Sequence, residues 1–242
     1  MNELLEFAVE AHGGLERWRR AISITARLSI GGLVLANSGW ESALDNIAIR
    51  MDTRDQHAVL SPFTGIDRRG RFTPDRVAIE ANNGRVIDER FDPRTSFERD
   101  GFQVTWDALQ LTYFAARAVW TGMTVPFVLA RPGFETEELE PWGEDGEMWR
   151  GLHAVFPTRI ASHSAHQLFY FGPDGLLRRH DYRMELVGNT AAADYTDDHQ
   201  VFDGISFPTL RRTVRREPDA TTLPEPALVT MDVAQVTVES AV

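Results

Sequence analysis

The chain has 242 residues, with 36 acidic and 25 basic residues and a formal net charge of −11. This charge argues against general affinity for nucleic-acid backbones and for anionic membrane surfaces. That length is enough to bury one sizeable core. The chain has no Cys, and all 25 basic residues are Arg, which excludes disulfides, thiolate nucleophiles, Lys Schiff bases and the Lys of a phosphate-binding loop.

The chain begins with a broken helix followed by a strand. Apolar residues recur at helical spacing over residues 2–20, and Gly13-Gly14 interrupts the pattern. From Ile22 to Ile30, apolar residues alternate with polar ones, which predicts a strand with one buried face. Further strands are predicted at 41–51, 56–61, 76–81 and 85–91.

A second helical pattern covers about residues 105–120, and the rest of the chain is typical of strands. Asp203-Gly204 is a tight-turn sequence between two of them. The segment 217–226, rich in Pro and Glu, predicts a surface loop. The strands are predicted at 134–140, 147–156, 164–172, 176–187, 193–202, 205–216 and 227–239.

These elements predict a mainly β (α+β) fold with about eleven strands. Two helical regions cannot cover both faces of so many parallel strands, so sequential antiparallel hairpins are favoured. A sheet of this size must curl to bury its inner face. We therefore expect residues 1–242 to form a single half-barrel domain, a large curved antiparallel sheet wrapped around the 105–120 helix as a plug, with a cavity between them.

The hairpin over residues 164–187 gives the clearest prediction of which side chains point inward. With an even loop, one face is aromatic with a few polar groups, and it comprises Gln167, Phe169, Phe171, Arg178, His180, Tyr182 and Met184. The other face carries more charge and is expected to face solvent; it includes Leu168, Tyr170, Arg179, Asp181 and Arg183. For the hairpin over 195–212, both faces mix apolar and ionisable residues, and the pattern does not choose between them.

His180 and Tyr182 form the best candidate catalytic pair. They lie two positions apart on one strand face, where an imidazole can exchange a proton and a phenol can donate to a developing oxyanion. The alternative is a hydrogen-bonded pair in an ordinary core. The candidate ligand-binding residues are Gln167, Phe169, Phe171, Met184, Trp106 and Trp149, of which the tryptophans are equally consistent with core packing.

Two histidine-containing segments suggest metal binding, but their spacing argues against it. His163 and His166 are three positions apart, so on a strand they point to opposite faces. Asp197-Asp198-His199 alternates in the same way and has no second cluster with matching spacing. The sequence also lacks the common hydrolase, zinc-protease and dinucleotide-binding motifs. We expect no metal site and no cofactor.

Several short motifs resemble those of bacterial proteins in the lipoprotein-localisation-factor (LolA/LolB-like) superfamily. They are Ala11-His12-Gly13-Gly14-Leu15-Glu16-Arg17-Trp18, Arg178-Arg179-His180-Asp181-Tyr182, Asp198-His199, Phe202-Asp203-Gly204 and Phe207-Pro208-Thr209. The resemblance implies an open, curved antiparallel barrel with helices as a plug and a hydrophobic cavity, which in the carriers of that superfamily holds acyl chains. It also implies that the scaffold can host chemistry, because a cofactor-independent enzyme of violacein biosynthesis has this fold.

The first functional hypothesis is a half-barrel that binds a hydrophobic, lipid-like or secondary-metabolite-like molecule. It includes cofactor-independent isomerisation, cyclisation or elimination, with His180 moving a proton. The alternative is a non-catalytic lipid or small-molecule carrier or sensor. Glu3 stands where a secretory signal would be basic, and the longest apolar run, 30–36, is far below the roughly 20 residues of a spanning helix. We therefore expect a cytoplasmic protein without stable membrane insertion.

Overall fold

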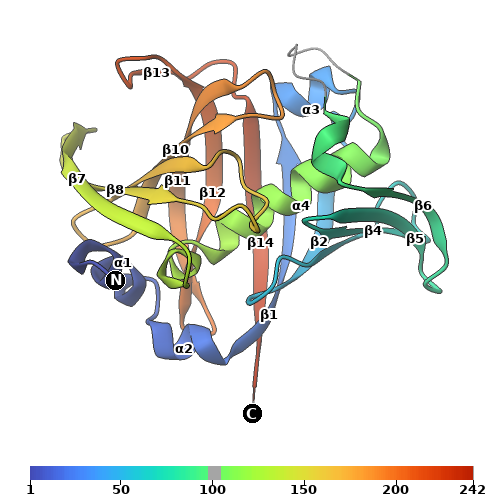
Figure 1. The fold of residues 1–242 in the computed structure, drawn as a ribbon, viewed down its shortest axis with the longest axis horizontal. Helices are drawn as coiled ribbons and strands as arrows, with labels where there is room; N and C mark the ends of the chain where they lie inside the picture. The colour runs from blue at the N-terminus through green and yellow to red at the C-terminus, as the bar shows by residue number, and fades with distance from the viewer. Residues whose placement is uncertain (98–104, 242) are drawn as a thin grey trace.

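The computed structural model describes residues 1–97 and 105–241 and shows one open antiparallel sheet of 14 strands curved around a central helix (Figure 1). The hydrogen-bonded order is β6-β5-β4-β3-β2-β1-β14-β12-β11-β10-β9-β8-β7, with β13 paired to β12. The strands of the first half are β1 (Ala21–Gly31), β2 (Leu44–Asp52), β3 (Ala58–Ser61), β4 (Arg68–Thr73), β5 (Arg76–Ala81) and β6 (Val86–Phe91).

The second half continues the same sheet beyond β1. Its strands are β7 (Glu135–Glu144), β8 (Glu147–Val155), β9 (His166–Phe171), β10 (Leu177–Met184), β11 (Thr190–Phe202), β12 (Ile205–Arg216), β13 (Thr222–Leu223) and β14 (Val229–Ser240). The helices are α1 (Glu3–Ala11), α2 (Leu15–Arg20), α3 (Leu33–Asn37) and α4 (Ala108–Thr124), with 3₁₀ turns η1 (Pro93–Ser96) and η2 (Phe127–Ala130). Of the helices in the described ranges, none is long and apolar enough to cross a membrane.

The predicted fold class is confirmed, but the sheet has 14 strands where about eleven were expected. Strand β4 was not expected, because Arg68, Arg69 and Arg71 hide its pattern, and the two-residue β13 falls inside the predicted surface loop. Helix α3, which follows Gly32, was not expected either. A Cβ on Gly32 would lie 2.7 Å from the carbonyl oxygen of Leu228, so the close approach of β14 requires glycine there.

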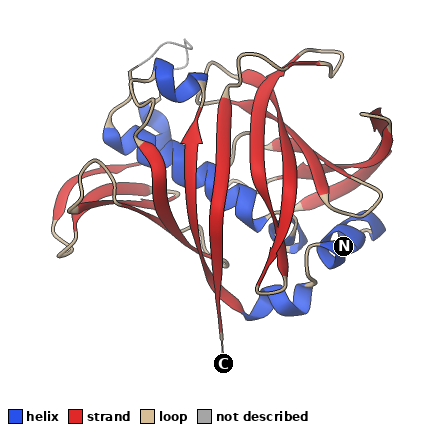
Figure 2. Cartoon of the chain, turned by 180° about the vertical axis from the view of Figure 1, so that it is seen from behind, coloured by secondary structure: helices blue, strands red, loops and turns tan. Residues whose placement is uncertain are grey.

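Helix α4 lies across the concave face of the sheet, as Figure 2 shows from behind. Asp107 and Gln110 form a capping box at its start, in which each side chain accepts a hydrogen bond from the other residue's backbone N–H. From Leu109 to Thr124 its residues are buried, apart from the half-buried Ala118. A helix that is buried on all sides is part of the core, and α4 packs most extensively on β3, β4 and β5.

Helix α1 closes one end of the half-barrel near the turns of β9–β10 and β11–β12 (Figure 1). His12, at its carboxyl end, is 2% exposed, and its Nδ1 donates to the carbonyl of Ala8 at 2.7 Å. The ring also lies 6.0 Å from that of His199, centroid to centroid. Burial lowers the pKa of His12 to about 4 and that of His199 to about 4, so both rings are neutral at pH 7.

We expect the protein to lose stability in mild acid because of these rings. In the unfolded chain a histidine takes up a proton near pH 6.5, whereas folded His12 does so only near pH 4. Between these values the unfolded state binds more protons, so the free energy of unfolding falls as the pH falls, by about 3 kcal/mol for His12. Urea unfolding at pH 7 and pH 4.5 should show a smaller drop for His12→Asn, which keeps a donor for Ala8. An identical drop in both proteins would contradict this.

The predicted alternation in β1 holds from Ile24 to Ile30 but not at its start. Ile22 is 42% exposed and Ser23 is 1% exposed, because the pairing of β1 with β14 shifts between Ala21 and Ser23. A bulge reverses the faces of the residues that precede it.

Two predictions for β10 are wrong. Arg178 was expected to share the inward face with His180, but the pairing of β9 with β10 shifts between Leu177 and Arg179, and Arg178 bonds Asp174 in the turn. Arg179 and Asp181 were expected to face solvent. They do point to the outer face, yet they are only 1% and 2% exposed.

Candidate functional site

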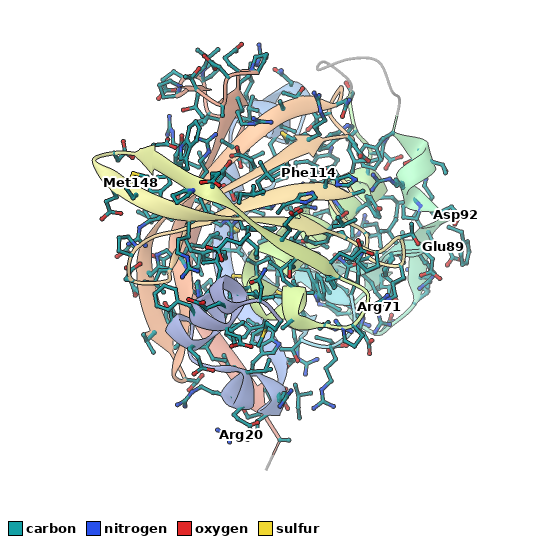
Figure 3. All side chains as sticks on the ribbon, turned by 60° about the vertical axis from the view of Figure 1, so that its left-hand side comes forward. Arg20, Arg71, Glu89, Asp92, Phe114 and Met148 are labelled. Carbon is teal, nitrogen blue, oxygen red and sulfur yellow. The ribbon has the colours of Figure 1, made fainter. Side chains whose placement is uncertain are left out.

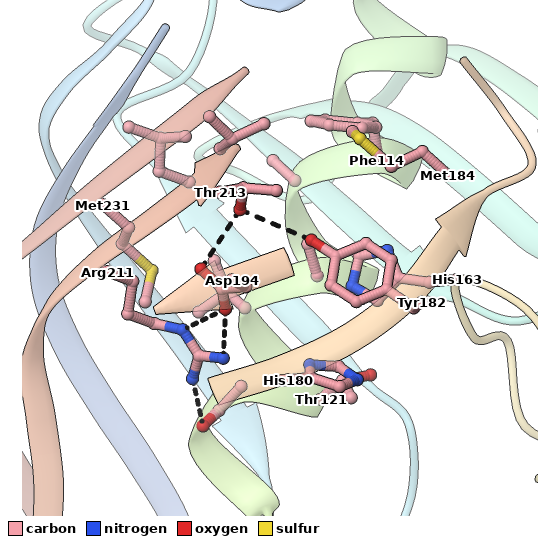
Figure 4. Close-up of a pocket in the computed structure, with 16 residues that line it drawn as sticks. Phe114, Thr121, His163, His180, Tyr182, Met184, Asp194, Arg211, Thr213 and Met231 are labelled. Atoms are coloured by element: carbon pink, nitrogen blue, oxygen red, sulfur yellow. Dashed lines mark hydrogen bonds and ion pairs between the residues drawn. The ribbon is translucent and has the colours of Figure 1, made fainter. Parts of the chain in front are cut away.

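A cavity of about 50 Å³ lies between α4 and the strands β10, β11, β12 and β14 (Figure 4). Figure 3 shows Phe114 of α4 in the interior, in contrast to Met148 at the tip of the β7–β8 hairpin. The apolar part of the wall comprises Ile30, Phe114, Ala115, Ala118, Val119, Met184, Val229 and Met231. The polar part comprises Thr121, His163, His180, Tyr182, Asp194, Arg211 and Thr213.

The strand register brings the polar part together. His180 is paired with Phe169 of β9 on one side and with Asp194 of β11 on the other. Asp194 is paired with Thr213 of β12, and Thr213 with Val229 of β14. Directly paired residues share a face, so these side chains form one row across the concave surface opposite α4.

Asp194 and Arg211 form a buried ion pair that also holds the helix. Arg211 Nε donates to Asp194 Oδ2 at 2.9 Å, and each side chain is 7% exposed. Arg211 Nη1 donates to the carbonyl of Gly122 in α4 at 3.0 Å. A Cβ on residue 122 would lie 2.9 Å from that same Nη1 atom, so glycine makes room for the guanidinium. The pair thus joins β12 to the side of α4 that faces the cavity.

Tyr182 and His163 lie on the opposite side of the cavity. Thr213 donates to Asp194 Oδ1 at 3.1 Å, so the Tyr182 hydroxyl, 3.4 Å from Thr213 Oγ1, acts as the donor to it. The Tyr182 ring stacks on that of His163, with centroids 4.0 Å apart. Burial raises the pKa of Tyr182, and burial together with the charge of Arg117 holds the pKa of His163 well below 6.5. At pH 7 the phenol is protonated and the imidazole is neutral.

His180 is oriented by Gln167. Its Nε2 donates to Gln167 Oε1 at 2.6 Å, and Gln167 Nε2 donates to the carbonyl of Ser164 at 2.8 Å. Burial and the positive charge of Arg211 hold the pKa of His180 well below 6.5. The ring is therefore neutral, with Nδ1 as its hydrogen-bond acceptor.

The predicted site residues fall into two groups. His180, Tyr182 and Met184 line the cavity, Gln167 bonds His180, and Phe169 stacks on His180 with centroids 4.3 Å apart.

The other three predicted residues lie outside the cavity lining. Phe171 contacts His12 in the core, with ring centroids 6.4 Å apart. Trp106 packs on the cavity-lining residue Phe114, with ring centroids 4.8 Å apart. Trp149 lines a groove on the outer face instead.

Sequence reasoning missed Asp194, Arg211, Thr213 and His163. The first three belong to strands whose faces the alternation did not distinguish. His163 and His166 do point apart, as predicted, but His163 is 6% exposed and lines the cavity. His166 is exposed on the outer face, where its Nδ1 lies 3.0 Å from His153 Nε2.

The outer face carries a second polar cluster, centred on Arg179. Its guanidinium donates to both carboxylate oxygens of Asp181, at 2.6 and 2.9 Å, and to Glu144 at 2.7 Å. It also donates to the carbonyl of Ala220 at 2.8 Å and lies 5.7 Å from the centre of the Trp142 ring. The cluster therefore fastens the tip of the β7–β8 hairpin and the loop before β13 to β10. Beside it lies an open groove of about 600 Å³.

The concave site offers hydrogen-bonding groups and no metal-binding cluster. Within the described ranges no group of three or more His, Asp or Glu side chains is placed to hold a metal ion. What the site provides is a neutral imidazole acceptor, a protonated phenol and a compensated ion pair, set among apolar side chains. Such a set can orient a polar group on a hydrophobic molecule.

Comparisons with known proteins identify the fold. No family model matches the chain, and no curated protein matches it. A solved LolA superfamily protein from Nitrosomonas europaea is 8% identical and superposes with a TM-score of 0.53, over 99% of this chain and 93% of that one. A DUF1329 family protein from Desulfovibrio piger is 11% identical, with a TM-score of 0.55 over the same shares. The chain has the LolA-like fold, which confirms the resemblance noted in the sequence at the level of fold.

Proposed function

We propose that this protein binds a hydrophobic small molecule between α4 and the concave face of the sheet. The observation that carries the proposal is the cavity itself, which has an apolar wall and a polar cluster at the centre of a LolA-like half-barrel. Its lining resembles that of ligand sites in general, which are mostly apolar with a few placed polar groups.

Binding requires the cavity to expand. Ligand sites usually measure about 300–1,000 Å³, whereas this cavity measures about 50 Å³. Met184 and Met231 line it, and their unbranched side chains can repack around a guest. Helix α4 packs mainly on β3–β5, so separation from β10–β12 would enlarge the cavity without detaching the helix from the rest of the sheet. Of the contacts described above, the bond from Arg211 to Gly122 is the one that such a movement would break.

We expect Ala118→Leu to weaken binding of the neutral dye 1-N-phenylnaphthylamine by about tenfold or more, because a longer side chain fills the expanding site. Ala118 is the half-buried cavity residue of α4, so the change adds bulk there at little cost in packing. The matched control is Ala108→Leu, in the first turn of the same helix and outside the cavity. Dye fluorescence during titration measures the affinities. Equal affinities for both variants, or no binding to the unaltered protein, would overturn the proposal.

A second candidate function is cofactor-independent isomerisation, cyclisation or elimination of a bound, secondary-metabolite-like compound. It is favoured by a specific arrangement, the neutral His180 ring 4.6 Å from the Tyr182 ring, centroid to centroid, in the same cavity. His180 would accept a proton and Tyr182 would donate one. Mass spectrometry of a co-purified compound before and after incubation distinguishes the two functions. A compound returned unchanged supports a carrier, and a converted one supports an enzyme.

A further inference from the structure

Arg117 of α4 is a buried cation without a carboxylate partner. It is 1% exposed, and no Asp or Glu among the described residues lies within ion-pair distance of it. Its Nη1 donates to the carbonyl of Ser162 at 2.6 Å, and its guanidinium carbon lies 5.9 Å from the centre of the Tyr113 ring. Its Nε is buried and has no hydrogen-bond partner. Burying a charge without a counter-ion is costly, so this arrangement calls for a reason.

The nearest ion pair does not compensate Arg117. Arg94 Nη1 donates to the same Ser162 carbonyl at 3.1 Å, and Arg94 is itself paired with Glu185. Two guanidinium groups thus converge on one backbone oxygen with a single carboxylate between them. Burial lowers the pKa of Arg117 to about 10, so it still carries its charge at neutral pH. The excess at this point is one positive charge.

His163 connects this excess charge to the cavity. Its ring lines the cavity, and its Nδ1 is buried without a partner. It follows Ser162, whose carbonyl bonds Arg117, and it lies close enough for the charge of Arg117 to lower its pKa. Both groups therefore have unused hydrogen-bonding capacity, and His163 lines the cavity whereas Arg117 lies outside its lining. In contrast, Asp194 and Arg211, on the opposite wall, satisfy each other.

We propose that the cavity's ligand carries a carboxylate on a hydrophobic body, and that Arg117 is its counter-ion beside His163. This rests on the proposed function and names the chemical class of its ligand. A single negative charge matches the single unpaired cation, and a carboxylate can accept from the Nε edge of a guanidinium with the geometry that Arg favours. The neutral His163 ring adds a second donor to the bound anion when its proton is on Nδ1, the atom without a partner.

The test compares three amphiphiles with the same tail and different heads: dodecanoate, dodecanol and dodecyltrimethylammonium. Each displaces 1-N-phenylnaphthylamine from the full chain, and the concentration for half displacement is measured. We expect dodecanoate to reach half displacement at a concentration about tenfold lower than dodecanol, because a charge-assisted hydrogen bond strengthens binding by about that factor. The ammonium compound should need the highest concentration. Arg117→Met should remove the preference for the acid, and Arg50→Met, an equal charge change at the exposed surface, should keep it.

Thermal unfolding without ligand separates a binding role from a structural one. If Arg117 serves the ligand, Arg117→Met keeps or raises the melting temperature, because it removes an unpaired buried charge. Equal displacement by acid and alcohol, or an acid preference that survives in Arg117→Met, overturns the inference and leaves the proposed function standing. If neither the dye nor any amphiphile binds, both fall. The ranking of the three amphiphiles is measured on the unaltered protein. It therefore tests the preference for a carboxylate even if Arg117→Met does not fold.

Discussion

Replacing Arg211 by Met should lower the free energy of unfolding by about 3–5 kcal/mol. The substitution leaves Asp194, 7% exposed, as a buried carboxylate facing the apolar wall of the cavity. It also removes the donor to the Gly122 carbonyl and with it the bond between β12 and α4. Urea unfolding at pH 7, followed by tryptophan fluorescence, measures the loss.

A double variant shows whether the loss comes from the stranded charge. Arg211→Met combined with Asp194→Val removes both members of the pair, and buried ion pairs replaced by apolar residues often cost little. We expect the double variant to recover most of the stability that the single variant loses. An Arg211→Met protein within about 1 kcal/mol of the original would show that the pair is not buried as described.

Arg179→Met should have an effect of similar size on the other face of the sheet. The Arg179 and Asp181 side chains are each 1% exposed, and the substitution leaves Asp181 without its bidentate partner. Breaking such a pair costs about 3–5 kcal/mol. Glu144 and Ala220 also lose the hydrogen bonds that Arg179 donates, although Glu144 keeps the one from Tyr195, so the tip of the β7–β8 hairpin and the loop before β13 should be held less tightly to β10.

The control for this prediction is Arg50→Met. Arg50 is paired with Glu239 at 2.8 Å, but both side chains are more than half exposed. An exposed pair contributes at most about 1 kcal/mol, so this variant should unfold almost as the original does. Hydrogen exchange should be faster in β7 and β8 of Arg179→Met alone. Unchanged exchange there would contradict the fastening role of Arg179.

The fold was largely predictable because its signals are local. Alternation in β1, the Asp203-Gly204 turn and the even register of the β9–β10 hairpin at His180 each depend on neighbouring residues. The curved antiparallel sheet around a helix follows from those signals. The errors arose where a bulge shifted the register, at Ile22 and Arg178, and where arginines occupied a strand.

The candidate site was only half predictable because its charges are paired across the fold. His180 and Tyr182 stood out through their aromatic strand face. Asp194 and Arg211 lie 17 positions apart, and either alone reads as a solvent-facing residue. Arg117 gave no signal, since a cation inside a helical pattern normally points outward. Only the packing of α4 against the sheet shows that it is buried.

The proposed ligand enters between α4 and the sheet, and the methionine methyl groups report on that space directly. Of the six Met residues in the sequence, Met184 and Met231 line the cavity, Met51 is buried elsewhere and Met148 is 60% exposed. Carbon-13 methyl NMR during titration with 1-N-phenylnaphthylamine should shift the Met184 and Met231 signals while those of Met51 and Met148 stay in place. Saturating dye that leaves Met184 and Met231 unmoved, or that shifts Met148 alone, would contradict this proposal.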